Sequence, residues 1–120
     1  MSAAATSLVK LAIEGRVARI TLDRPPLHIL DFPMMEALAA AVAKVAREPG
    51  VAALILTSSG DKALSAGVDI NVHTPEQAPA MLERFHEIVR AIGTLPCPTV
   101  AGVRGVALGG GFELALACDM

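Results

Sequence analysis

Hydrophobic residues along this chain switch regularly between a β-type and a helical pattern, and this alternation leaves few folds open. Two β-type runs over residues 8–13 and 17–22 are separated by Glu14-Gly15-Arg16, which predicts a β-hairpin. Helical spacing of apolar residues then predicts a helix over residues 33–47. The continuous apolar run over residues 51–57 is typical of a strand buried on both faces.

The same alternation continues in the second half of the chain. We expect a helix over residues 75–93, a short buried strand over residues 99–103 and a further helix from residue 112 to 118. This order predicts an α/β fold with a sheet that is largely parallel after the hairpin. The sequence shows no internal repeat, low-complexity tract or domain boundary, so residues 1–120 are expected to form one domain.

Composition and charge exclude several classes of function. The net charge is -2 and only 2% of residues are aromatic, so a nucleic-acid partner has little support. Gly, Pro or charged residues break every apolar run well short of a membrane span, and residues 1–7 do not resemble a secretory signal. Cys97 and Cys118 lack metal-type spacing, which favours a reduced, cytoplasmic protein.

A glycine triplet marks the first candidate site. Gly109-Gly110-Gly111 precedes the last predicted helix, where the backbone can approach a ligand and the first turn offers free N–H groups. Such amides suit an anion or a developing oxyanion, and Glu113 follows directly. A carboxylate beside an amide cradle suits proton transfer next to a polarised carbonyl. Taken alone, however, the triplet is as consistent with a tight turn needed only for packing. A lone glutamate such as Glu113 is more often a solvated helix residue.

A second glycine-containing segment, Ala66-Gly67-Val68-Asp69, lies earlier in the sequence. A predicted helix and a predicted strand separate it from the triplet. By itself it is an ordinary loop in which Asp69 caps a helix. Together, the two segments resemble the enoyl-CoA hydratase/isomerase (crotonase) family. In that family an A-G-x-D segment and a G-G-G-x-E segment each donate one backbone N–H to a thioester oxygen. The resemblance extends over nearly the whole chain, including the hairpin and the Arg24-Pro25-Pro26 turn.

The resemblance implies a fold of repeated ββα units that assembles as a homotrimer or a dimer of trimers. It implies that the amides of Val68 and Gly110 form the oxyanion site and that Glu113 is the catalytic acid/base. It also implies an acyl-CoA substrate, with coenzyme A as part of that substrate and no metal or other cofactor. The residues expected along the coenzyme A and acyl path are Ala66, Val68, Asp69, Ile70, Asn71, Gly109 and Gly110.

The activity implied is that of a lyase that hydrates an enoyl-CoA or cyclic dienoyl-CoA thioester. His28 after Pro25-Pro26 resembles the cyclohexa-1,5-diene-1-carbonyl-CoA hydratase branch of the family. A double-bond isomerase, which needs a single glutamate, and a non-catalytic subunit with a crotonase scaffold remain alternatives. Hydratases usually use a second glutamate beyond the G-G-G-x-E helix. The resemblance therefore implies the N-terminal half of a longer fold, truncated before its C-terminal helical region, and we expect these 120 residues alone to be inactive.

The remaining reactive side chains are expected to be structural. Ser65 lacks a G-x-S-x-G context, and no serine begins the glycine helix as a ClpP-like serine hydrolase would require. Asp119 is expected to be structural, and Arg104 an ion-pair partner. The three histidines, His28, His73 and His86, have no spacing for a shared metal.

Overall fold

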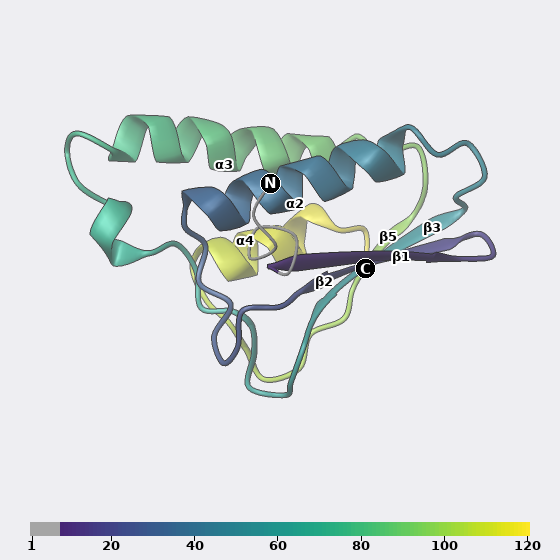
Figure 1. Cartoon of the computed structure of the whole chain (residues 1–120), viewed down its shortest axis with the longest axis horizontal. Coiled ribbons are helices and arrows are strands. Elements are labelled where there is room, and N and C mark those ends of the chain that lie inside the picture. The colour runs from purple at the N-terminus through teal and green to yellow at the C-terminus, as the bar shows by residue number, and fades with distance from the viewer. Residues whose placement is uncertain (1–7) are drawn as a thin grey trace.

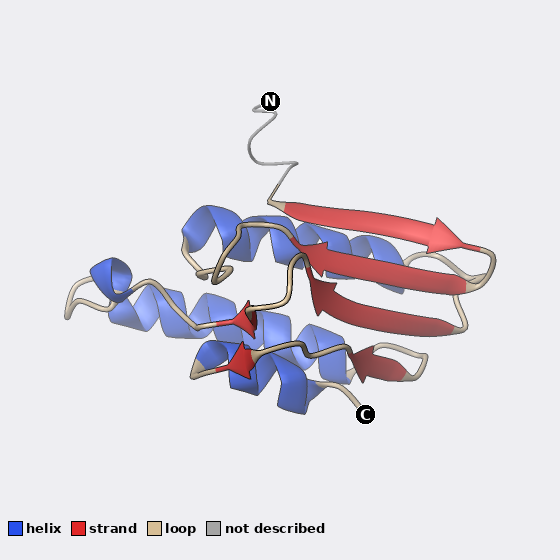
Figure 2. Ribbon diagram, turned by 90° about the horizontal axis from the view of Figure 1, so that it is seen from below, coloured by secondary structure: helices blue, strands red, loops and turns tan. Residues whose placement is uncertain are grey.

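A four-stranded sheet forms the centre of the structure, in the order β1-β2-β3-β5 (Figures 1 and 2). The computed structural model describes residues 8–120, so the prediction that residues 1–7 are no secretory signal lies outside the described residues. Strands β1 (Val9–Glu14) and β2 (Val17–Leu22) form the predicted hairpin. Strands β3 (Ala53–Ser58) and β5 (Thr99–Ala101) run parallel to β2, which confirms the largely parallel sheet.

Two long helices, α2 (Phe32–Ala46) and α3 (Ala78–Gly93), cover one face of this sheet (Figure 1). Helix α2 begins one residue earlier than predicted, directly after its N-cap Asp31, whose carboxylate accepts a hydrogen bond from the Met34 N–H at 3.0 Å. Helix α3 begins three residues later than predicted, since residues 74–77 form a turn closed by hydrogen bonds from Gln77 to Thr74. Helix α2 connects the parallel strands β2 and β3, and α3 lies in the longer connection from β3 to its parallel partner β5.

The core lies between the sheet and the two helices, and strand β3 contributes only one of its faces. Leu54, Leu56 and Ser58 are buried, whereas the alternate residues are half-buried. The prediction of a strand buried on both faces is therefore wrong for the described residues. The largest fully buried side chains are Phe85, Ile20, Leu22, Leu30, Met34, Met35, Leu38, Leu54, Leu56, Leu64, Met81 and Ile88.

A second, smaller sheet carries the two glycine segments. It pairs β4 (Ala63–Ser65) with β6 (Val106–Ala107), in parallel, and appears as two short arrows apart from the main sheet (Figure 2). The 3₁₀ helix η1 (Ile70–Val72) follows β4, and helix α4 (Gly110–Ala117) follows β6. Helix α4 begins two residues earlier than predicted, inside the glycine triplet itself.

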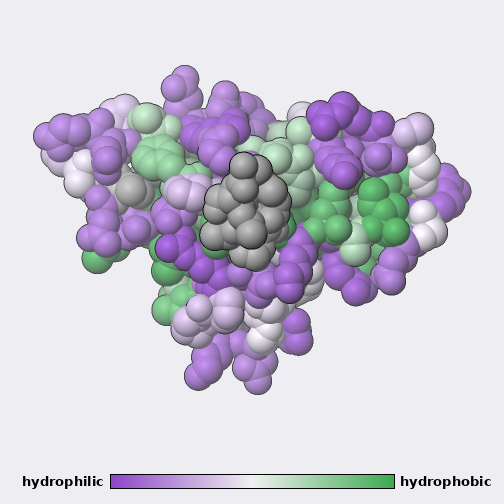
Figure 3. Space-filling view, viewed as in Figure 1, coloured by the Kyte–Doolittle hydropathy of each residue, from purple (hydrophilic) through white to green (hydrophobic). Residues whose placement is uncertain are grey.

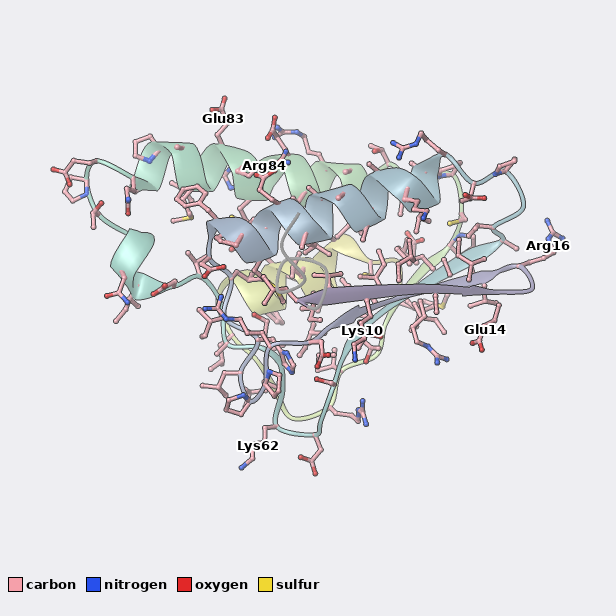
Figure 4. All side chains as sticks on the ribbon, in the orientation of Figure 1. Lys10, Glu14, Arg16, Lys62, Glu83 and Arg84 are labelled. Carbon is pink, nitrogen blue, oxygen red and sulfur yellow. The ribbon has the colours of Figure 1, made fainter. Side chains whose placement is uncertain are left out.

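The surface around the long helices is mostly polar, with an apolar patch between α2 and β1 (Figure 3). Arg84 of α3 reaches toward α2 (Figure 4) and forms a two-bond ion pair with Glu36, at 2.7 Å for each bond. Hydrogen bonds from this guanidinium lower the pKa of Glu36. Within residues 8–120, no helix combines the length and apolar character needed to cross a bilayer.

Candidate functional site

The pairing of β4 with β6 brings the two glycine segments side by side. Ser65 and Ala107 are register partners, and the Leu108 N–H donates to the Ser65 carbonyl at 3.1 Å. The chain leaves β4 at Ala66 and leaves β6 at Leu108, so both segments begin at the carboxyl ends of these two parallel strands. Parallel pairing therefore joins two loops that are separated in the sequence by η1, α3, β5 and β6.

Direct contact between the segments depends on their glycines. Gly67 has a φ of 107°, and a Cβ atom there would lie 3.0 Å from the Leu108 oxygen and 3.3 Å from the Gly110 nitrogen. A Cβ atom at Gly110 would lie 3.3 Å from the Cγ2 atom of Val68. The backbones of the two segments thus approach each other more closely than most side chains allow.

Val68 and Gly110 present main-chain N–H groups at this contact. Leu30 donates to the Gly67 carbonyl and accepts from the Asp69 N–H, both at 2.9 Å, so the residues on either side of Val68 are held. Gly110 is the first residue of α4, where N–H groups lack intrahelical acceptors. Within residues 8–120, neither the Val68 N–H nor the Gly110 N–H has a hydrogen-bond acceptor. The described part of the chain therefore leaves the donor capacity of both amides unused.

Glu113 lies in the first turn of α4 with an exposed side chain. Its own N–H donates to the Gly109 carbonyl at 3.0 Å, which places it one helical turn beyond the glycine loop. Phe112 and Leu116, one turn apart on α4, are exposed apolar side chains at 52% and 66% exposure, and Leu108 in the preceding loop is 54% exposed. The Glu113 carboxylate therefore lies on a helix that also exposes apolar side chains.

The other residues predicted for the site surround this contact. Ala66 is half-buried, and its N–H donates to the Leu27 carbonyl at 2.8 Å. Asp69 accepts from the Asn71 N–H at 2.9 Å and caps η1, as predicted. Asn71 is exposed, and Ile70 is 84% exposed. Gly109 is the exposed N-cap of α4, with a φ of 52°.

Several residues have the structural roles predicted for them, and one does not. The Asp119 carboxylate accepts from the Thr99 N–H at 2.9 Å, which joins the end of α4 to β5. Cys97 and Cys118 are half-buried free thiols whose pKa values are raised by burial. Arg104 was expected to form an ion pair, but it donates to the Ser58 carbonyl at 2.9 Å and has no acidic partner within residues 8–120.

Two surface grooves lie away from the paired amides. One, of about 520 Å³, runs between α2 and α3, has five alanines among its lining residues and includes the Arg84–Glu36 pair. The other, of about 510 Å³, lies on the opposite side of the sheet from these helices and includes Arg19 and Arg104. Neither is lined by Val68, Gly110 or Glu113. Within residues 8–120, no cluster of three or more His, Cys, Asp or Glu side chains could hold a metal ion.

Two buried residues next to the paired segments were not predicted to belong to the site. Ser65 and His28 are both fully buried and hydrogen-bonded to each other through the Ser65 hydroxyl and the His28 carbonyl, at 2.8 Å. Their contact spans 37 residues of sequence. In the sequence, the one signal for this region is His28 after the paired prolines. That signal does not indicate that Ser65 is its hydrogen-bond partner.

Comparisons with known proteins agree on one family. The family model described as "Enoyl-CoA hydratase/isomerase" matches residues 12–120. The chain is 35% identical to a cyclohexa-1,5-dienecarbonyl-CoA hydratase of Thauera aromatica, over 100% of this chain and 46% of that protein. It is 33% identical to a probable enoyl-CoA hydratase of Bacillus subtilis (strain 168), over 93% of this chain and 45% of the relative.

Solved structures give the same result. The structure of Pseudomonas aeruginosa DspI superposes with a TM-score of 0.90 at 32% identity, covering 96% of this chain and 45% of that one. The chain thus spans about half the length of the relatives that it matches.

Proposed function

Because this chain belongs to the enoyl-CoA hydratase/isomerase family and has the crotonase fold, we propose that the full-length protein hydrates an enoyl-CoA thioester. The observation that carries the proposal is the contact between two segments whose Val68 and Gly110 amides have no acceptor within residues 8–120. Glu113 follows one of these amides by less than one helical turn. This combination suits chemistry that places negative charge on a carbonyl oxygen.

The reaction adds water across the double bond conjugated to the thioester. The water oxygen bonds to the β-carbon, and the electron pair of the double bond moves toward the carbonyl oxygen to give an enolate. The N–H groups of Val68 and Gly110 would stabilise this oxygen, and the loss of one such donor costs on the order of 3 kcal/mol in barrier height. Glu113 would exchange protons with the water and the α-carbon as general acid/base. The product gains one hydrogen and one hydroxyl, so the atoms balance without an oxidant or a reductant.

Substrate binding would use the residues around the amide pair. Ala66 and residues 68–71 would follow the coenzyme A portion, while Gly109 and Gly110 face the thioester. The exposed apolar side chains of Leu108, Phe112 and Leu116 support the placement of an acyl group near Glu113. Binding energy from the nucleotide end, remote from the reacting atoms, would position the thioester.

We also propose the cofactor use, the oligomeric state and the location of the full-length protein. Coenzyme A enters only as part of the substrate, and no metal or redox cofactor takes part. A homotrimer or a dimer of trimers is proposed, and the exposed apolar residues of α4 support burial against further protein. The free thiols of Cys97 and Cys118 are compatible with the reduced, cytoplasmic location that we propose.

A double-bond isomerase is the second candidate, because one glutamate can move a single proton between two carbons, and Glu113 is a glutamate in the same helical turn as the Gly110 amide. The name of the Thauera aromatica relative favours the hydratase instead, and with it a cyclic dienoyl thioester. A scaffold without activity is less consistent with a carboxylate placed beside two free amides.

The test is a spectrophotometric screen of the full-length protein with linear and cyclic enoyl-CoA esters. We expect loss of the enoyl-thioester absorbance with at least one of them, and a rise in thermal stability on binding. A ligand at about 100 times its Kd stabilises the folded state by about 2.7 kcal/mol. Turnover of 3-enoyl esters alone would identify an isomerase. A protein that neither turns over nor is stabilised by any coenzyme A ester would refute the proposed function.

A further inference from the structure

The ring of His28 is held at both nitrogens inside the protein. Nδ1 accepts a hydrogen bond from the Arg24 N–H, and Nε2 donates to the Ser59 carbonyl, each at 2.9 Å. Because one nitrogen accepts and the other donates, the ring is the neutral Nε2–H tautomer. The residue is fully buried and has a φ of 50°, which is uncommon for a residue other than glycine. His28 is therefore fixed in both ring and backbone.

The main-chain carbonyl of His28 continues this network into the A-G-x-D segment. It accepts from the Ser65 hydroxyl at 2.8 Å, and the same hydroxyl accepts from the Gly67 N–H at 3.1 Å. Ser65 is fully buried, and its carbonyl accepts from the Leu108 N–H of the second segment. Ser65 thus contacts both segments that carry the paired amides.

Residues 27–30 hold the rest of the segment in register. Ala66 donates to the Leu27 carbonyl at 2.8 Å, and Leu30 donates to the Gly67 carbonyl at 2.9 Å. The Gly67 carbonyl and the Val68 N–H belong to the same peptide unit and point in opposite directions. With the carbonyl held by Leu30 and the Gly67 N–H held by Ser65, the direction of the Val68 N–H is set by the turn that contains His28.

We propose that Ser65 and His28 are positioning residues that aim the Val68 N–H at the ligand oxygen. Neither would touch the substrate. Ser65 acts on the neighbouring Ala66–Gly67 peptide through the Gly67 N–H, and the turn around His28 holds the Gly67–Val68 peptide through Leu30. The expected effect on catalysis rests on the proposed function. The claim that these residues fix the orientation of the peptide rests on the hydrogen bonds alone. The turn around His28 is closed further by an ion pair between Arg24 and Asp31 at 2.6 Å.

The first variant is Ser65→Ala in the full-length protein. Without the hydroxyl, the Gly67 N–H and the His28 carbonyl lose their shared partner, and the bond from Leu30 alone holds the Gly67–Val68 peptide. We expect kcat to fall about 10- to 100-fold with KM within about threefold, because a small misplacement weakens contacts made in the transition state more than those made with the ground state. The bound enolate of acetoacetyl-CoA, followed by its ultraviolet absorbance, should fall in parallel, while saturated butyryl-CoA still binds.

Ser58→Ala is the matched control. The Ser58 hydroxyl is also buried and donates to a main-chain carbonyl, that of Ala63 at 2.6 Å, but it has no bond to the A-G-x-D segment. It should destabilise the protein as Ser65→Ala does while leaving kcat and the enolate absorbance unchanged.

A pair of His28 variants separates positioning from packing. His28→Asn tolerates the positive φ and keeps an acceptor for Arg24, so it should retain most activity, whereas His28→Leu should not.

Wild-type kcat and enolate absorbance in Ser65→Ala would overturn the inference, as would equal losses in Ser65→Ala and Ser58→Ala. If the wild type itself neither binds nor turns over coenzyme A esters, the proposed function fails instead. Crystal structures of both serine variants then decide the geometric claim. We expect the Gly67–Val68 peptide to reorient in Ser65→Ala alone, and an unmoved peptide would contradict it.

Discussion

Replacing Glu113 with glutamine is expected to lower kcat about 100-fold or more while leaving the affinity for a saturated acyl-CoA within about twofold. The amide side chain keeps the size and polarity of the carboxylate but cannot accept or donate the reacting proton. Glu113 has an exposed side chain and no hydrogen-bond partner for its carboxylate within residues 8–120, so stability should change little. Steady-state kinetics and binding titration on the full-length protein measure both quantities.

Glu83→Gln is the control for this experiment. Glu83 is also an exposed glutamate in a helix, but it lies on α3 and points away from the rest of the molecule (Figure 4). Its replacement removes the same charge without approaching the paired amides, and we expect wild-type kinetics. Wild-type turnover in Glu113→Gln would exclude this carboxylate as the proton-transfer group.

Replacing Gly111 with alanine is expected to lower the free energy of unfolding by about 2 kcal/mol or more and to abolish most activity. A Cβ atom at Gly111 would overlap the Ser65 carbonyl and lie 2.9 Å from the Ser65 Cβ. These atoms belong to the buried strand β4, which cannot move aside without breaking the β4–β6 pairing. Helix α4 would have to shift, and the Gly110 amide would shift with it.

Gly93→Ala provides the comparison, because Gly93 also lies in a helix but has open space around it, and an added Cβ atom would meet nothing within 4 Å among residues 8–120. Alanine is favoured over glycine in a helix by about 1 kcal/mol, so this variant should be as stable as the wild type or more so. Thermal melting of both variants gives the measurement. Equal melting temperatures for Gly111→Ala and the wild type would show that the contact between α4 and β4 is looser than described.

The overall fold could be predicted from the sequence because its signals are local. The hairpin, the helices α2 and α3 and the parallel order of the later strands each follow from hydrophobic spacing and turn residues. Boundaries were less predictable, since the start of α3 depends on a turn at Thr74. The burial of β3 was predicted wrongly because an apolar run does not tell which of its faces the helices cover.

The candidate site could be predicted only in part. The two glycine segments have recognisable sequences, and the structure brings them into contact. The roles of Val68, Gly110 and Glu113 remain predictions that the experiments above address. The link between His28 and Ser65 could not be anticipated, because a hydrogen bond to a main-chain carbonyl leaves no mark on residue type. Arg104 was misjudged for a similar reason, since its partner is a carbonyl rather than a carboxylate.

The proposed catalysis depends on two main-chain N–H groups reaching one thioester oxygen. A crystal structure of the full-length protein with bound acetoacetyl-CoA tests this most directly. We expect the nitrogens of Val68 and Gly110 both to lie about 2.7–3.2 Å from the thioester carbonyl oxygen, with the Glu113 carboxylate facing the α-carbon. A bound thioester whose oxygen contacts neither nitrogen, or only one of them, would contradict the proposed oxyanion site.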